Sequence, residues 1–199
     1  MFATVGTSFL LSKTVQAEAA RGNLQEPRTQ MEVPPTIHDA TDKKVIIGLG
    51  SRQVSFLKIS VYVMAMYVRP KDVTMLEKAK LWTTASSPMS DVDQAQKMLS
   101  HPIDISIRIV PTRPTGAAHL RDGFTRSLLQ LMRDQAKDLS EDEERNILEA
   151  IQDFKAKFPK AKGEDIGTVD SQWLADNFVM GYVKLDIVKN VLEEALSLE

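Results

Sequence analysis

The chain has 199 residues, of which 43% are hydrophobic and 26% are charged, which is enough apolar material for the core of one globular domain with or without a tail. Its 25 lysine and arginine residues against 27 acidic residues give a net charge of −2, so no global field favours nucleic acid or an anionic membrane. The absence of cysteine excludes disulfide scaffolds, cysteine-ligated zinc, iron–sulfur clusters and thiol nucleophiles.

The N-terminal region differs from the rest in composition. Residues 1–17 carry hydroxyl side chains and one lysine but no acidic residue, which is typical of an organelle transit peptide. We therefore predict a targeting segment over residues 1–22; the alternative is a floppy N-terminus without a signal. Residues 23–42 contain three prolines and are predicted to be an extended lead-in to a domain over residues 43–199. No apolar run reaches the roughly 20 residues that span a bilayer.

Three strands are predicted from hydrophobic alternation, over residues 43–50, 54–68 and 103–110. The last is the most regular, because isoleucines at 103, 105, 107 and 109 alternate with Asp104, Ser106, Arg108 and Val110. This pattern predicts one packed face and one polar face.

Helices are predicted over residues 72–80, 91–99, 115–137, 140–158 and 171–199. Ser140 and Glu143 form a capping-box pattern, and Trp173, Leu174 and Phe178 are the predicted buried face of the last segment. The order of strands and helices indicates an α+β fold, with an antiparallel sheet covered by helices on one face.

No complete catalytic motif is present, because residues 48–50 (GLG) lack the third glycine of a dinucleotide fingerprint and neither a P-loop nor GxSxG occurs. Arg52 follows this glycine bend. In a partly dry cleft its guanidinium would hold a carboxylate, phenolate or enolate through paired hydrogen bonds; the alternative is a surface arginine in a weak ion pair. The same alternatives apply to Arg108, Arg113, Arg121 and Arg126.

Two other side chains are candidate ligand contacts. Tyr62 would place a phenol in a groove, or it is a half-buried strand tyrosine without such a role. His119, near the start of the long helix, would serve as a metal ligand, or it is a solvent-facing or capping residue of the first helical turn.

Several motifs make the family recognisable: GLGSR (48–52), FLKISVY (56–62), MYV (66–68), RIVPTRPT (108–115), HLRDGFTRS (119–127) and SQWLA (171–175). Over about residues 30–190 the chain resembles the chalcone isomerase family, and within it the fungal mitochondrial branch of altered-inheritance-of-mitochondria proteins. The resemblance implies an open-faced β-sandwich, a large antiparallel sheet with a layer of helices and a ligand cleft between them. It also implies a mitochondrial location.

The family's site residues are retained only in part. Arg52 matches the arginine that steers the substrate phenolate in the plant enzymes. Tyr62 stands at the threonine position, while the tyrosine position falls near Leu120 and the asparagine position near Ser127. Loss of the groups that stabilise an enolate predicts that flavanone formation is lost.

The family's strand pair is expected between residues 158 and 167, where this chain has a short polar link. One hairpin is therefore predicted to be missing, which would expose a sheet edge. A shortened product and a divergent form that completes its sheet with a partner both account for this.

The resulting expectation is a non-catalytic mitochondrial protein that binds an apolar carboxylate, a fatty acid or haem, at Arg52, Tyr62, Leu120 and Ser127. No cofactor is required; if haem binds, His119 or Tyr62 would be its axial ligand. The alternatives are an intramolecular lyase (an isomerase) that uses Arg52 on another substrate, and a truncated product without independent function.

Overall fold

The computed structural model describes residues 6–10, 22–38, 42–54, 56–81, 92–113, 116–158, 165–183, 185–187 and 195, and for 6–10, 165–170 and 186–187 it describes the backbone. The strands are β1 (Gly6–Leu10), β2 (Leu24–Gln25), β3 (Glu32–Val33), β4 (Thr36–His38), β5 (Lys43–Val54), β6 (Ile59–Val68), β7 (Ile105–Pro111), β8 (Asp165–Asp170) and β9 (Asp186–Ile187). The helices are α1 (Pro70–Lys78), α2 (Val92–Leu99), α3 (Ala117–Gln135), α4 (Glu141–Lys157) and α5 (Gln172–Tyr182), with a 3₁₀ turn, Ala136–Asp138, after α3.

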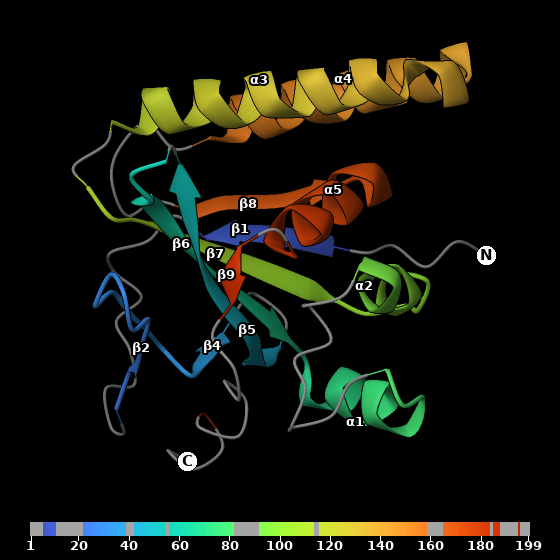
Figure 1. The fold of residues 1–199 in the computed structure, drawn as a ribbon. Coiled ribbons are helices and arrows are strands. Elements are labelled where there is room, and N and C mark those ends of the chain that lie inside the picture. The colour runs from blue at the N-terminus through green and yellow to red at the C-terminus, as the bar shows by residue number, and fades with distance from the viewer. Residues whose placement is uncertain are drawn as a thin grey trace.

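One mixed sheet organises the fold (Figure 1). Its strands follow the order β4-β5-β6-β7-β1-β8, and β9 pairs with Gly50 and Ser51 in the second half of β5. All neighbours are antiparallel except β1 and β7, which run parallel. The predicted α+β fold, an antiparallel sheet with a helix layer, is confirmed, with this one parallel pair as an addition.

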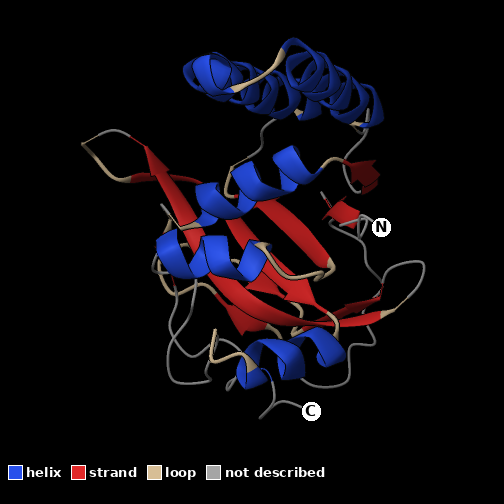
Figure 2. Ribbon diagram, turned by 90° about the vertical axis from the view of Figure 1, so that its right-hand side faces the viewer, coloured by secondary structure: helices blue, strands red, loops and turns tan. Residues whose placement is uncertain are grey.

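Helices cover one face of the sheet, as Figure 2 shows for α1, α2 and α5, while α3 and α4 form an antiparallel pair above α5 in Figure 1. The isoleucines of β7 and the methionines of β6 pack under these helices in the main core. Ser140 and Glu143 form the predicted capping box at the start of α4. Burial of the apolar faces of the helices against these strand residues, rather than helix propensity alone, holds the helices in place.

The opposite sheet face is buried as well, which corrects the prediction of a polar face on β7. Ser106 is fully buried and Arg108 is 7% exposed. Leu24, Val33 and Ile37 of the segment 22–38 pack against Tyr67 and other residues of this face in a second apolar cluster. The Tyr67 hydroxyl donates to the Pro34 carbonyl oxygen at 2.9 Å. The predicted alternation of β7 is present, but residues 22–38 cover its polar face.

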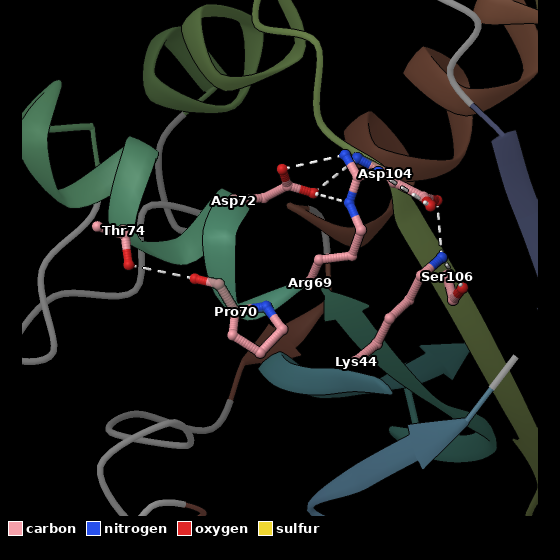
Figure 3. Close-up of polar contacts among 7 residues, drawn as sticks. All are labelled: Lys44, Arg69, Pro70, Asp72, Thr74, Asp104 and Ser106. Atoms are coloured by element: carbon pink, nitrogen blue, oxygen red, sulfur yellow. Dashed lines mark hydrogen bonds and ion pairs between the residues drawn. The ribbon is translucent and has the colours of Figure 1, made fainter. Parts of the chain in front are cut away.

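A buried ion network joins the sheet to α1 (Figure 3). The Lys44 Nζ donates to Asp104 Oδ1 at 2.7 Å and to Ser106 Oγ at 2.8 Å. Arg69 Nε donates to Asp72 Oδ2 at 2.7 Å, and the Asp104 backbone N–H donates to the same carboxylate at 3.2 Å. Because Lys44 is only 1% exposed, these contacts are what make its charge tolerable.

One C-terminal expectation needs correction, and another falls largely outside the described residues. The predicted helical segment over residues 171–199 forms α5, which ends at Tyr182, and then the short strand β9. Leu174 and Phe178 are buried as predicted, and Trp173 is half-buried. The predicted missing hairpin falls largely on residues 159–164, outside the described residues; beyond them β8 pairs with β1.

Candidate functional site

Arg52 and Tyr62 lie opposite each other on β5 and β6. They are register partners in the antiparallel pair, so their side chains leave the same face of the sheet. The pairing shifts between Arg52 and Gln53, and a bulge of this kind bends a strand and re-aims its side chains. Both residues are half-buried, on the face that the helices cover. The structure thus brings together the two strand residues that the sequence selected.

The Tyr62 phenol remains a hydrogen-bond donor. Burial raises the pKa of Tyr62 above its ordinary value of 10.0, and the positive charge of Arg52 lowers this pKa by a smaller amount. The phenol is therefore neutral at physiological pH. A neutral O–H beside a guanidinium offers two kinds of donor to one anionic group.

An aromatic cluster adjoins Tyr62. Phe124 of α3 has its ring centroid 5.6 Å from that of Tyr62 and 5.8 Å from that of Phe178 on α5. Phe154 of α4 lies 6.4 Å from Phe124 and 5.8 Å from Phe178. Such separations are typical of favourable tilted and edge-on ring pairs. Three helices therefore supply an apolar surface that begins at the Tyr62 ring.

Arg52 differs from other half-buried cations of the structure. Arg69 has carboxylate partners, whereas no hydrogen bond or ion pair of the Arg52 guanidinium is found within the described residues. A half-buried positive charge without a carboxylate neighbour is an attractive position for an anion.

The other predicted contacts are placed differently. Leu120 is buried in the helix-side core, one turn before Phe124. Ser127 is exposed on α3. Sequence analysis did not propose Phe124, Phe178 or Thr125 as site residues. The buried hydroxyl of Thr125 has no hydrogen-bond partner among the described residues. Nothing in the sequence showed that Phe124 would contact Tyr62.

The predicted haem axial ligand His119 lies away from the aromatic cluster. His119 is exposed in the first turn of α3 and lies roughly 140° around the helix axis from Phe124. Across the described ranges, no group of three or more His, Asp or Glu side chains is arranged to hold a metal ion. None of the described helices is both long and apolar enough to cross a membrane.

A family model described as chalcone isomerase like matches residues 42–165, more than half of the chain and the whole segment that carries Arg52, Tyr62 and Phe124. The chain belongs to the chalcone isomerase-like family. The predicted resemblance is thereby confirmed.

Fungal relatives share this family domain. An uncharacterized protein of Schizosaccharomyces pombe is 37% identical over 100 residues, which cover 46% of this chain and 39% of that protein. Altered inheritance of mitochondria protein 18, mitochondrial, of Vanderwaltozyma polyspora is 27% identical over 141 residues, or 59% and 42% of the two chains. The Lachancea thermotolerans protein of that name is 30% identical over 110 residues, or 45% and 36%. The predicted mitochondrial branch agrees with these names, and the chain spans about two fifths of these relatives' length.

Among solved structures, a fatty-acid binding protein of Arabidopsis thaliana has a similar fold. The TM-score is 0.57 at 18% sequence identity, with 89% of this chain and 98% of that chain covered. At this identity the likeness concerns the fold of the chalcone isomerase-like chain.

Proposed function

We propose that this chalcone isomerase-like chain is a mitochondrial, non-catalytic binder of an apolar carboxylate, a fatty acid, held at Arg52. The observation that carries the proposal is the half-buried Arg52 guanidinium, without a carboxylate partner among the described residues, opposite the neutral phenol of Tyr62. Support for a mitochondrial location comes from the names of the fungal relatives.

Each part of a fatty acid has a counterpart at this position. The carboxylate would accept hydrogen bonds from the Arg52 guanidinium and from the Tyr62 hydroxyl. The hydrocarbon chain would lie against Phe124 and its aromatic neighbours, where burial of apolar area stabilises it. The fatty-acid binding function named for the Arabidopsis neighbour supports this ligand class.

Displacement of a dansyl-labelled fatty acid from the purified chain tests the proposal. Arg52→Ala is expected to weaken binding about tenfold or more, the effect of losing a charge-assisted hydrogen bond. Arg126→Ala removes an exposed arginine of α3 and is the matched control, with unchanged binding expected. Equal affinities of wild type and Arg52→Ala would refute the role of Arg52.

Two further outcomes would change the assignment. A Soret absorption band of the purified protein that disappears in Arg52→Ala, with no fatty acid bound, would select haem as the ligand. Ring closure of a chalcone above the rate in buffer, lost in Arg52→Ala, would select an intramolecular lyase, the alternative that the family name raises.

A further inference from the structure

The turn between β5 and β6 exposes large apolar side chains. Phe56 is 91% exposed, Leu57 is 65% exposed and Val54 is 42% exposed. Among the described residues, the other large hydrophobic side chain as exposed as Val54 is Val92, on α2. Apolar area is thus concentrated at one turn, and exposed patches of this kind mark contact sites.

This turn is mounted on paired strands. Val54 and Ile59 are the last register pair of β5 and β6, and Figure 2 shows the turn projecting from the sheet at its upper left. The residue after β7 is bonded to β6. The Thr112 backbone N–H donates to the Val61 carbonyl oxygen at 3.0 Å, and the Thr112 hydroxyl donates to the Ser60 carbonyl oxygen at 2.7 Å. Phe56 and Leu57 are therefore held outward by a fixed support.

Two positively charged residues, Lys58 and Arg113, lie next to the exposed apolar side chains of this turn. Lys58 has a φ of 49°, a left-handed conformation in which glycine is favoured and lysine is strained. Arg113 is exposed directly after Thr112, beside the start of β6. No aspartate or glutamate occurs over residues 45–71 or 105–121, although the whole chain has a net charge of −2. The turn is therefore a local positive region on a slightly negative protein.

We propose that Phe56 and Leu57 insert into the interface of an anionic phospholipid bilayer, with Lys58 and Arg113 on the lipid headgroups. We call these four residues the tip surface. An apolar side chain enters the boundary between headgroups and acyl chains, and each nearby cation adds attraction to anionic lipid. Arg52 lies two residues before Val54, so docking would bring the proposed ligand site close to the bilayer.

Charge complementarity favours a bilayer over a second copy of the chain. A symmetric contact through the same tip surface would bring Lys58 and Arg113 of one copy against those of the other, and like charges in contact are unfavourable. An anionic membrane satisfies both the apolar and the charged parts of the tip surface.

Flotation of the full chain with lipid vesicles tests the proposal. We expect binding to vesicles of equal parts phosphatidylcholine and phosphatidylglycerol, and much weaker binding to phosphatidylcholine alone. Phe56→Ser with Leu57→Ser is expected to lower the partition coefficient about tenfold or more, and Lys58→Asn or Arg113→Gln about fivefold each. Val92→Ser, an exposed apolar residue on α2, is the matched control and should bind as wild type does.

Several results would overturn the proposal. They are absence of wild-type binding to the anionic vesicles, equal binding to both compositions, and unchanged binding by the double serine variant. Concentration-dependent dimerisation that the double serine variant abolishes would assign the tip surface to self-association instead. Melting curves check that each variant is folded. Fatty-acid displacement in vesicle-free solution should not change when Phe56 and Leu57 are both replaced by serine. A failure of the membrane proposal can therefore be told apart from a failure of the ligand proposal at Arg52.

Discussion

The hydroxyl of Tyr182 on α5 lies 2.7 Å from the position that a β-carbon would occupy on Gly48 of β5. The Tyr182 ring carbon Cζ is 2.9 Å from the same position. Tyr182 is fully buried, and its hydroxyl has no hydrogen-bond partner among the described residues. Helix α5 therefore sits against β5 at a distance that glycine permits, four residues before Arg52.

Gly48→Ala is expected to destabilise the fold by about 1–3 kcal/mol, because the new methyl group would force α5 away from the sheet. Thermal and urea unfolding measure this loss. Gly123→Ala is the matched control. Apart from its chain neighbours and the backbone of its own helix, this glycine has no heavy atom within 4 Å of its β-carbon position, so alanine should stabilise α3 by roughly 1 kcal/mol.

Tyr182→Phe provides a second check of the same contact. Removing a buried hydroxyl without a partner is expected to be neutral or stabilising. In the Gly48→Ala background the phenylalanine should recover part of the lost stability, since the hydroxyl is the nearest atom to the added methyl group. Additive effects of the two substitutions would show that the contact is not the cause.

Two ion pairs with equal N–O distances of 2.7 Å differ in burial, and this difference predicts their contributions to stability. Lys44–Asp104 is 1% and 22% exposed, whereas Lys157–Asp153 is 42% and 44% exposed. Asp104→Asn leaves a buried ammonium without its carboxylate charge and is expected to cost about 3 kcal/mol. Asp153→Asn is expected to cost less than about 0.5 kcal/mol. Similar losses in urea unfolding would contradict this account.

Sequence patterns predicted the long strands β5, β6 and β7 and helices α1 to α4, because these depend on local periodicity and capping. They did not predict β1, β8 or β9, and they made the last helix too long. Ser140 and Glu143 act within one helical turn, so their interaction was visible in the sequence. The burial of Lys44 was not, since its partner Asp104 lies 60 residues away. The covering of the second sheet face by residues 22–38 is equally non-local and left no periodic signal.

Some residues of the candidate site could be predicted from the sequence, and others could not. Family resemblance located Arg52 and Tyr62, and strand pairing brings them together. Phe124 and Phe178 join them through helix packing, which no spacing in the sequence encodes. The proposed binding roles of Leu120, Ser127 and His119 remain predictions, and the last two side chains are exposed.

Fatty-acid binding is expected to depend on pH through Tyr62 and the ligand carboxylate. Because the pKa of Tyr62 is raised above 10.0, the phenol stays a donor and affinity should be constant from about pH 7 to about pH 10. Affinity should fall at higher pH, where a phenolate would repel the carboxylate. It should also fall near pH 4–5, about the pKa range of a carboxyl group, as the ligand is neutralised.

Tyr62→Phe separates these effects in the same titration. It is expected to weaken binding at neutral pH by about twofold to tenfold, the loss of one hydrogen bond. The alkaline decline should disappear in this variant while the acidic decline remains. An alkaline decline that persists without the phenol would assign it to another group.

Strand β1 gives a last prediction, because residues 1–22 are predicted to be a targeting segment and β1 lies within them. Ser8 pairs with Ser106 of β7 on one side and with Thr168 of β8 on the other. A chain starting at Asn23 would leave the facing edges of β7 and β8 unpaired, so it is expected to melt at lower temperature and to aggregate on heating. Differential scanning calorimetry and light scattering measure both effects.

Thr7→Pro keeps the full length and tests the strand itself. Thr7 pairs with Val169 inside the sheet, where proline cannot donate to the ladder and is expected to cost about 1–3 kcal/mol, the cost of leaving a buried polar group unsatisfied. If both variants melt as the full chain does, the pairing of β1 does not stabilise the domain, and removal of a targeting segment would leave the fold intact. If both lose stability, β1 is part of the folded domain, and the prediction of a cleaved targeting segment over residues 1–22 is contradicted.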